Sequence, residues 1–349
     1  MQQVLLTCRP GFESDLTAEI QDKSASIGVF GFVRATPNDG FVVFEGHDDS
    51  AADMLLKNLP FANIIFSRQW LGVIAHLDHV DPTDRIGAVV DVLEGRSCRG
   101  IWMTYPDTNE GKGLSKLTRK LERPLEKALS GQIHPQAASN LHLFFESGTD
   151  IWVGVTPVKN GSPWATGFPR LRQPPSAPSR STLKLEEAWL QLIPEAQRAS
   201  LLKPFQKAVD LGAAPGGWTW QLVQRGMQVT AIDNGPMDKA LMESGQVTHL
   251  REDAFAYKPP RPVDWLVCDM VEKPARVAEL MERWLVKGWT RFAIFNLKLP
   301  MKRRWLEVSQ IMERMEGEFE SSGRRYRLKA KQLYHDREEI TVFAAPEHY

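Results

Sequence analysis

The stretch Asp210-Leu-Gly-Ala-Ala-Pro-Gly-Gly217 decides the fold of this chain, because it joins the apolar pair Ala208-Val209 to an amphipathic segment, Trp218 to Arg225. A strand that ends in glycines and continues as a helix presents free backbone N–H groups at the positive end of the helix dipole. We therefore predict that the loop binds a nucleotide-like ligand. Its spacing is not G-x-G-x-x-G and no Gly-Lys-Ser/Thr follows, so it matches neither the dinucleotide fingerprint nor the P-loop.

Short apolar segments alternate with helical patterns on both sides of this loop. After residue 178 we predict helices over 181–192, 218–225, 238–244, 275–284 and 305–316. The predicted strands span 208–211, 228–232, 247–251, 263–268, 291–296, 326–332 and 340–344. This order predicts an α/β, Rossmann-like domain with a mixed, mostly parallel sheet and a closing antiparallel strand. In such a sheet, ligands bind outside the carboxyl ends of the strands.

Charged residues stand at those strand ends. Asp233 follows the second predicted strand, Asp253 the third, Asp269 the fourth and Lys298 the fifth. A carboxylate after the second strand is placed to accept hydrogen bonds from ribose hydroxyls, and one after the third can accept from the adenine amine. A nicotinamide-dependent oxidoreductase would share Asp233, but Asp253 and the glycine loop together favour S-adenosylmethionine as the cofactor.

Four segments resemble the FtsJ-type ribose 2′-O-methyltransferases: Ser179-Arg-Ser-Thr-Leu-Lys-Leu-Glu-Glu, the glycine loop with Trp218, Val267-Cys-Asp-Met and Phe295-Asn-Leu-Lys. The catalytic Lys-Asp-Lys-Glu set of that family implies catalytic roles for Lys184, Asp269, Lys298 and Glu339. Glu338 is adjacent to the last of these, and the strand register with Thr341 and Phe343 favours Glu339. The resemblance implies no metal, and cofactor contacts from Ser181, Gly212, Ala214, Pro215, Gly216, Gly217, Trp218, Asp233, Asp253 and Asp269.

Two roles are open for Lys298 in such a reaction. Methyl transfer to a hydroxyl requires alignment of the reacting groups and loss of a proton. As a base, Lys298 would need its pKa lowered by roughly three units, towards which Lys184 and a sulfonium would act and against which Asp269 and Glu339 would act. In the milder alternative it orients the hydroxyl, and the proton leaves after methyl transfer.

Other methyl acceptors are less well matched. Amino-group methylation commonly uses Asn/Asp-Pro-Pro-Tyr/Phe after the fourth strand, where this chain has Asp269-Met-Val-Glu. Methylation of cytosine C5 needs a nucleophilic cysteine there. Cys268 lies inside the predicted strand, and we expect it to be a core residue.

The residues before the catalytic domain form two predicted α+β modules. Residues 1–74 follow a β-α-β-β-α-β order, with a hairpin at Asn38-Asp39-Gly40, which is ferredoxin-like. Residues 75–160 are predicted to be a separate module, and 161–178 a proline-rich linker before the methyltransferase domain at 179–349. The whole chain resembles a bacterial family that methylates the 2′-O of a cytidine in 23S rRNA, which implies that the second module is an RNA-binding THUMP domain.

Three groups of basic residues are predicted to contact RNA phosphates. A solvated surface would explain the first group equally well. Residues 324–331 add positive charge that we expect near the same sheet edge as the catalytic set. The three groups are five residues on one helix, three around the linker and three after Lys298: Lys112, Lys116, Arg119, Lys120, Arg123; Arg170, Arg172, Arg180; Lys302, Arg303, Arg304.

The composition is compatible with an intracellular enzyme. Forty-three basic residues balance 43 acidic ones among 349, so any attraction to RNA must be local. Three scattered cysteines argue against a disulfide framework, and no apolar run is long enough for a membrane span. We expect a cytoplasmic monomer that acts on 23S rRNA before full ribosome assembly, without membrane or protein partners. The alternatives are methylation of another RNA position or base, and an RNA-binding protein with a degenerate methyltransferase fold.

Overall fold

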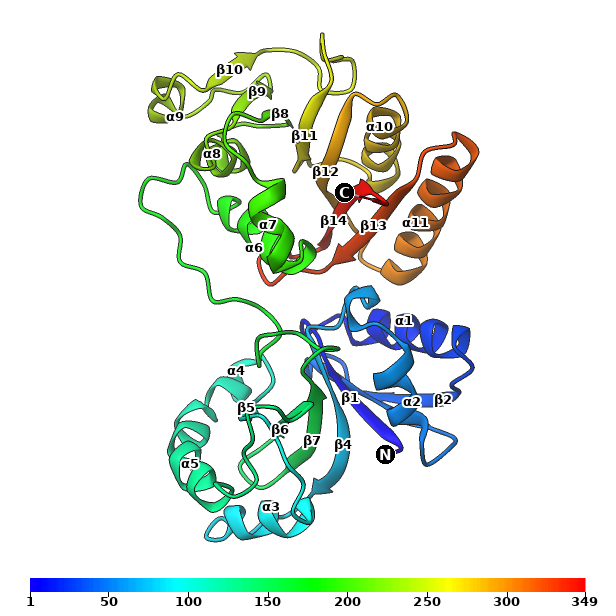
Figure 1. The fold of residues 1–349 in the computed structure, drawn as a ribbon, viewed down its shortest axis with the longest axis vertical. Coiled ribbons are helices and arrows are strands. Elements are labelled where there is room, and N and C mark those ends of the chain that lie inside the picture. Colours follow the sequence, from blue (N-terminus) through cyan, green and yellow to red (C-terminus); the bar gives the residue numbers. More distant parts are fainter. Residues whose placement is uncertain (349) are drawn as a thin grey trace. The chain divides into compact units, whose positions relative to one another are not determined.

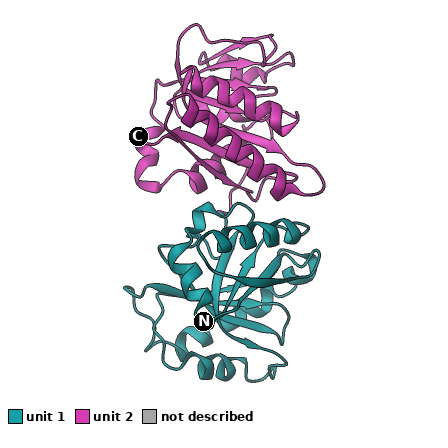
Figure 2. Cartoon of the chain, turned by 90° about the vertical axis from the view of Figure 1, so that its right-hand side faces the viewer, with its two compact units in different colours: residues 1–168 teal, residues 169–349 magenta. Residues whose placement is uncertain are grey.

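The computed structural model describes residues 1–348. They divide into two compact units, one of residues 1–168 and one that begins at Pro169 (Figure 2). Each unit is built on a seven-stranded sheet. No helix in the described part of the chain is long and apolar enough to cross a membrane.

The first unit begins with the β-α-β-β-α-β order predicted for residues 1–74 (Figure 1). Its sheet has the strand order β2-β3-β1-β4-β7-β6-β5. The strands are β1 (Gln3–Thr7), β2 (Gly31–Ala35), β3 (Phe41–Gly46), β4 (Gln69–Leu77), β5 (Ile101–Thr104), β6 (Ser139–Phe145) and β7 (Ile151–Pro157). The helices are α1 (Glu13–Ser26), α2 (Ala51–Asn58), the 3-10 turn η1 (Phe61–Asn63), α3 (Arg85–Leu93), α4 (Asn109–Lys112) and α5 (Ser115–Ala128).

The two modules predicted before the linker share this one sheet. Strand β4 pairs with β1 on one side and with β7 on the other, and it continues to Leu77. A boundary after residue 74 therefore falls inside a strand, and the expectation of a separate second module is corrected. The physical reason is that residues 70–73 are buried in β4, which lies between β1 of the first module and β7 of the second.

The first part of the predicted linker belongs to the first unit. The side-chain Nε2 of Gln69 donates to the carbonyl oxygens of Ser162 and Trp164, both at 3.0 Å. Gly167, with φ +91°, lies so close to the backbone of Arg68 that a Cβ atom there would be 2.1 Å from its carbonyl oxygen. The extended connection between the units thus begins at Pro169.

The second unit is the α/β domain expected from the glycine loop. Its strand order is β10-β9-β8-β11-β12-β14-β13, in which only β14 and β13 are antiparallel to their neighbours. The strands are β8 (Lys207–Leu211), β9 (Gln228–Ile232), β10 (Val247–Leu250), β11 (Val263–Cys268), β12 (Thr290–Lys298), β13 (Tyr326–Lys331) and β14 (Glu339–Pro346). The helices are α6 (Thr182–Leu192), α7 (Glu195–Leu201), α8 (Gly217–Gln224), α9 (Lys239–Glu243), α10 (Pro274–Val286) and α11 (Arg304–Ser321), of which α7 was not predicted.

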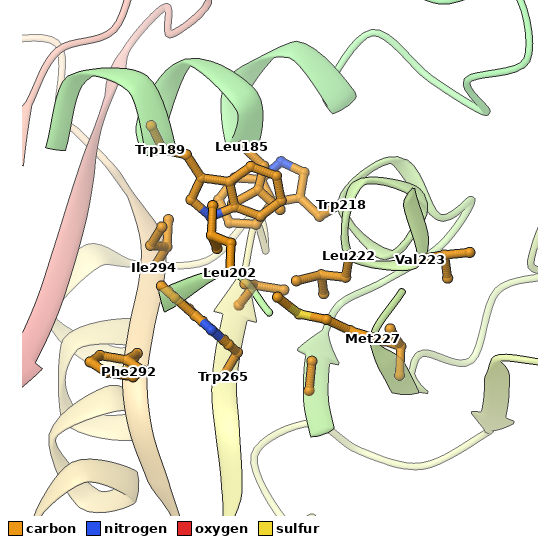
Figure 3. Close-up of a cluster of buried hydrophobic side chains, with 14 of the residues drawn as sticks. Leu185, Trp189, Leu202, Trp218, Leu222, Val223, Met227, Trp265, Phe292 and Ile294 are labelled. Atoms are coloured by element: carbon orange, nitrogen blue, oxygen red, sulfur yellow. The ribbon is translucent and has the colours of Figure 1, made fainter. Parts of the chain in front are cut away.

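A tryptophan-rich core holds the loop-bearing half of this sheet in place (Figure 3). Trp189 of α6, Trp218 of α8 and Trp265 of β11 are almost completely buried in it. Complete burial of such a side chain contributes on the order of 2–3 kcal/mol. Helix α6 is thereby fixed against α8, and with it the position of Lys184 in its first turn.

Candidate active site

Four charged side chains meet beyond the carboxyl ends of β11 and β12. Lys184 comes from the first turn of α6, and Asp269 directly follows β11. Lys298 ends β12 and Glu339 begins β14, where the two residues face each other in the antiparallel register. The sheet therefore brings together the four residues that the sequence resemblance had assigned to one set.

Cations and anions alternate in this cluster. The Asp269 carboxylate lies 3.3 Å from the Lys184 Nζ through Oδ2 and 2.9 Å from the Lys298 Nζ through Oδ1. Glu339 contacts Lys184 with Oε1 and Lys298 with Oε2. The exposed fractions of the side chains are 15% for Lys184 and Asp269, 24% for Lys298 and 6% for Glu339. The lysines thus keep access to a ligand while their charges are balanced.

The pKa of Lys298 bears on its two open roles. Burial on its own would lower this pKa, but the negative charges of Asp269 and Glu339, and their hydrogen bonds to Nζ, raise it above its usual value. The lowering that a neutral base would need is therefore not supplied by the residues around it. In this arrangement Lys298 is an ammonium group that donates hydrogen bonds.

Glu338 points to a different partner from its neighbour Glu339. Its Oε2 accepts from Arg304 Nε at 2.9 Å and Nη2 at 2.6 Å, and 44% of its side chain is exposed. Arg304 itself is only 7% exposed. Its expected role in phosphate contact is therefore corrected, because the guanidinium is buried and already paired.

Glycine is required at several positions of the loop after β8. Gly212 and Gly216 have φ angles of +75° and +117°. A Cβ atom would lie 2.3 Å from Met270 Cγ at the first and 2.4 Å from Leu241 Cδ2 at the second. The Ala214-Pro215 peptide bond is cis. Glycine is therefore favoured at these two positions, and at the first of them the backbone lies close to the ends of β9 and β11.

Two carboxylates follow the neighbouring strands β9 and β10, and the first of them contacts the loop. Asp233 accepts from the backbone N of Ala214 at 3.0 Å and from that of Gly235 at 2.7 Å. Asp253 is exposed and accepts from the backbone N of Phe255 at 2.9 Å. An ionised carboxylate offers about four lone-pair positions, so both can accept further hydrogen bonds. Since β8, β9 and β10 are parallel neighbours, both carboxylates lie beyond the same edge of the sheet as the glycine loop.

The other expected cofactor residues lie around the start of α8. The Trp218 indole is 2% exposed and donates through Nε1 to the Ser181 carbonyl oxygen at 3.0 Å. The Ser181 hydroxyl lies 2.7 Å from that of Ser179. The indole of Trp218 is thus a core group, and this residue can meet a ligand only through its backbone.

Cys268 is completely buried in β11, and burial raises the pKa of its thiol to about 12. Such a thiol does not act as a nucleophile near neutral pH. Within residues 1–348 no group of three or more His, Cys, Asp or Glu side chains is arranged to hold a metal ion.

The predicted RNA-contacting residues are distributed more widely than expected. Lys112 lies on the short helix α4, before Gly113, and pairs with Asp107 at 3.4 Å. The expected row of five cations on one helix is thus a row of four on α5. Apart from Arg304, all the other predicted residues are exposed: Lys116, Arg119, Lys120, Arg123, Arg170, Arg172, Arg180, Lys302 and Arg303.

The first part of the basic segment 324–331 is not at the catalytic edge. Arg327 faces Ala345 in the β13–β14 ladder, whereas Glu339 stands at the opposite end of β14. Residues 324–327 are therefore remote from the charged cluster. The expectation was wrong because β13 runs antiparallel to β14, which places only its last residues, such as Lys331, near the site.

Several residues around the cluster were not singled out in advance. Asn296 and Thr341 are polar residues inside two buried apolar strands, and this pattern could have marked them. Val271 and Met301, in the segments that follow Asp269 and Lys298, are 92% and 73% exposed. For these two the sequence carries no signal, since solvent exposure of an apolar side chain depends on the fold.

Comparison with known proteins agrees with this geometry. Residues 1–71 match the RlmM ferredoxin-like domain, 84–157 the N-terminal region of ribosomal RNA large subunit methyltransferase M, and 177–306 the FtsJ-like methyltransferase family. This last match makes the second unit an S-adenosylmethionine-dependent methyltransferase domain.

Relatives named ribosomal RNA large subunit methyltransferase M align over nearly the whole chain. The protein of Cellvibrio japonicus is 50% identical over 346 residues, which cover 98% of this chain and 99% of that protein. The protein of Shigella sonnei is 47% identical over 350 residues, covering 98% and 96%. Among solved structures, TrmN from Thermus thermophilus matches 99% of this chain and 100% of its own, at 13% identity and a TM-score of 0.35. The full-length relatives and the three matched regions together show that the chain belongs to the ribosomal RNA large subunit methyltransferase M (RlmM) family.

Proposed function

We propose that this rRNA methyltransferase transfers a methyl group to the 2′-hydroxyl of a cytidine in 23S rRNA. The observation that supports the ribose hydroxyl is the alternating cluster of Lys184, Asp269, Lys298 and Glu339 beside the glycine loop. Two ammonium groups held by two carboxylates can bind and orient a hydroxyl oxygen, whereas they offer no partner for activating a base carbon. The choice of cytidine rests on the family resemblance alone.

Each group of residues in the site has a separate proposed role. The glycine loop, Asp233 and Asp253 would hold S-adenosylmethionine, which supplies the methyl group as an electrophile when bound. Lys298, as an ammonium, donates to one lone pair of the 2′-oxygen and leaves the other directed at the methyl group. Asp269 and Glu339 keep both lysines in place. As the new C–O bond forms, the methyl group's bond to the donor sulfur would break; the hydroxyl proton then passes to water, because the methylated oxygen is strongly acidic.

Exposed cations supply the proposed contacts to the RNA backbone. Lys116, Arg119, Lys120 and Arg123 form one such group on α5, and Lys302 and Arg303 follow the catalytic Lys298. Binding that depends on such contacts weakens steeply with salt, with a slope of roughly 0.7 per phosphate contact on single strands. We propose that these cations bind 23S rRNA before full ribosome assembly. We also propose that the protein acts as a cytoplasmic monomer.

The role of Lys298 is tested by Lys298→Ala in single-turnover methylation of deproteinised rRNA at saturating cofactor. We expect the rate to fall by about 10²-fold, as the removal of one positioned hydrogen-bond donor commonly does. Lys203→Ala, which removes an exposed lysine of the same unit, is the matched control and should leave the rate unchanged. Full activity of Lys298→Ala would overturn the assignment.

The position of the methyl group is tested by reverse transcription at low dNTP concentration on rRNA treated with or without the enzyme. A 2′-O-methyl ribose gives a stop that depends on the dNTP concentration. A base modification that persists after the ribose is removed, or a stop at a nucleotide other than cytidine, would contradict the proposal.

A further inference from the structure

A chain of hydrogen bonds leads from the charged cluster into the interior of the sheet. Asn296 donates through Nδ2 to Asp269 Oδ1 at 2.9 Å, and its Oδ1 lies 2.7 Å from the hydroxyl of Thr341. That hydroxyl is also 3.0 Å from Oδ2 of Asp336. Asn296, Thr341 and Asp336 are all fully buried, and the first two face each other across β12 and β14.

The hydrogen atoms in this chain can be assigned from its chemistry. Asp269 lies between two ammonium groups as a carboxylate and can only accept, so Asn296 turns its NH₂ group to it. The amide oxygen of Asn296 then needs a donor, and the one hydrogen of the Thr341 hydroxyl supplies it. The Thr341 oxygen must in turn accept from its other neighbour. Asp336 can donate there only if its carboxyl group is protonated.

The surroundings of Asp336 agree with a neutral carboxyl group. Burial first, and then the negative charges of Glu339 and Glu187, raise its pKa well above the usual value, whereas the Leu333 N–H and the charge of Lys184 act in the other direction. Glu187 accepts from the backbone N of Tyr334 at 2.8 Å and of His335 at 3.1 Å, and from Gln191 Nε2 at 2.6 Å. Three donors thus satisfy the Glu187 side chain, whereas Asp336 faces a Thr341 hydroxyl whose hydrogen is already used by Asn296.

We propose that Asn296, Thr341 and a neutral Asp336 are positioning residues that fix the Asp269 carboxylate between Lys184 and Lys298. The inference rests on the proposed function, because it assigns further residues to the same reaction. Oδ1 of Asp269 is shared by Lys298 and Asn296. A fixed amide keeps that oxygen from turning towards solvent, and so keeps the Lys298 ammonium aimed at the ligand.

The experiment compares two pairs of full-length variants in which one member keeps the hydrogen bond. Thr341→Val removes the hydroxyl at nearly constant shape, and Thr341→Ser keeps it. Asp336→Ala removes the donor, and Asp336→Asn replaces a neutral donor by another. We expect Thr341→Val and Asp336→Ala to lower kcat by about 10- to 100-fold, as loss of supporting contacts around an active site commonly does. KM for rRNA should change less than about twofold, because no substrate contact is lost.

The conservative variants and the split between kcat and KM separate positioning from simple destabilisation. Thr341→Ser and Asp336→Asn should retain kcat within about threefold. Circular dichroism and Tm report whether each variant folds. If Thr341→Val does not fold, the comparison of Asp336→Asn with Asp336→Ala decides the question. Equal kcat and KM for wild type and a folded Thr341→Val or Asp336→Ala variant would overturn the proposal.

A second readout does not depend on activity. The ¹³C chemical shift of the Asp336 carboxyl group in the wild-type protein should be that of a protonated acid at pH 7, and an ionised carboxylate there would overturn the inference. Failure of the inference can be told from failure of the proposed function by Lys298→Ala. If that variant is inactive while Thr341→Val behaves as wild type, only the positioning inference fails, whereas a fully active Lys298→Ala refutes the ribose chemistry itself.

Discussion

Each unit of the molecule buries a chain of polar side chains in its sheet, and the two chains differ in charge. In the first unit, Thr156 donates to the carbonyl oxygen of Trp70 at 2.8 Å and lies 3.0 Å from His142 Nδ1. Thr104 lies 2.7 Å from His142 Nε2. Since the Thr156 hydrogen is used by Trp70, Nδ1 carries the ring proton, and Thr104 donates to Nε2.

The hydrogen-bond network around His142 is therefore neutral and fully buried. The network around Asp269 is charged, and its lysine end is accessible to solvent. His142 is fully buried, and burial lowers its pKa to about 3, so that it stays uncharged at neutral pH. Lys298 by contrast keeps 24% of its side chain exposed among paired charges. The difference indicates that a buried polar network belongs to a reaction centre only where its groups are charged and a ligand can reach them. A satisfied neutral network stabilises the fold instead.

The largest effect should follow from Asp269→Ala, which removes the central carboxylate of the charged cluster. The two lysines would lose their common partner, and the single-turnover rate should fall by about 10²- to 10³-fold or more. The unfolding free energy should change much less, since water can reach this partly exposed site. Asp49→Ala, which removes an exposed carboxylate of the first unit, is the control. If Asp269→Ala lowered the unfolding free energy strongly but left the folded enzyme fully active, the charged network would be the stabilising one, contrary to this prediction.

His142→Ala should have the opposite profile. The change leaves a cavity and deprives Thr104 of its partner, which together should cost about 3–4 kcal/mol of unfolding free energy. The methylation rate per folded molecule should stay the same. Denaturant unfolding and hydrogen exchange of the β6 and β7 amides measure the first quantity, with exposed His134→Ala as the control. A large loss of rate in the folded variant would show that the neutral network has a catalytic role.

The neutral network should also make the first unit sensitive to acid. The folded-state pKa of His142, about 3, lies below its ordinary value of 6.5. The unfolded chain therefore binds a proton in this window that the folded chain does not, and stability is lost as pH falls below 6.5. Between pH 6.5 and 5.0 the loss should approach about 2 kcal/mol. Hydrogen exchange of β6 at both pH values measures it, and His142→Ala should abolish the dependence.

Much of the second unit could be predicted from the sequence, because short apolar strands, helices and the glycine loop follow one another locally. The four clustered residues could be named because family motifs place each of them at a strand or helix end. What failed depended on pairing between distant segments. The burial of Arg304, the partnership of Asn296 with Thr341 and the continuation of β4 into the second module are set by the strand register. No local pattern encodes that register.

Asp210, at the start of the glycine loop, should give the smallest effect and one of opposite sign to that of His142. Burial raises the pKa of its carboxyl group to about 7, although Thr219 donates to it at 2.6 Å. Between its ordinary pKa of 3.8 and 7, the folded state holds a proton that the unfolded state has lost, so stability falls as pH rises. From pH 5.5 to 6.5 the unfolding free energy should fall by about 1 kcal/mol, and Asp210→Asn should abolish this pH dependence. Hydrogen exchange of the β8 amides at both pH values tests this, and equal slopes for wild type and variant would refute it. Opposite slopes in the two units would show that one rule, the preference of the buried interior for the uncharged form, acts on a base in the first sheet and on an acid in the second.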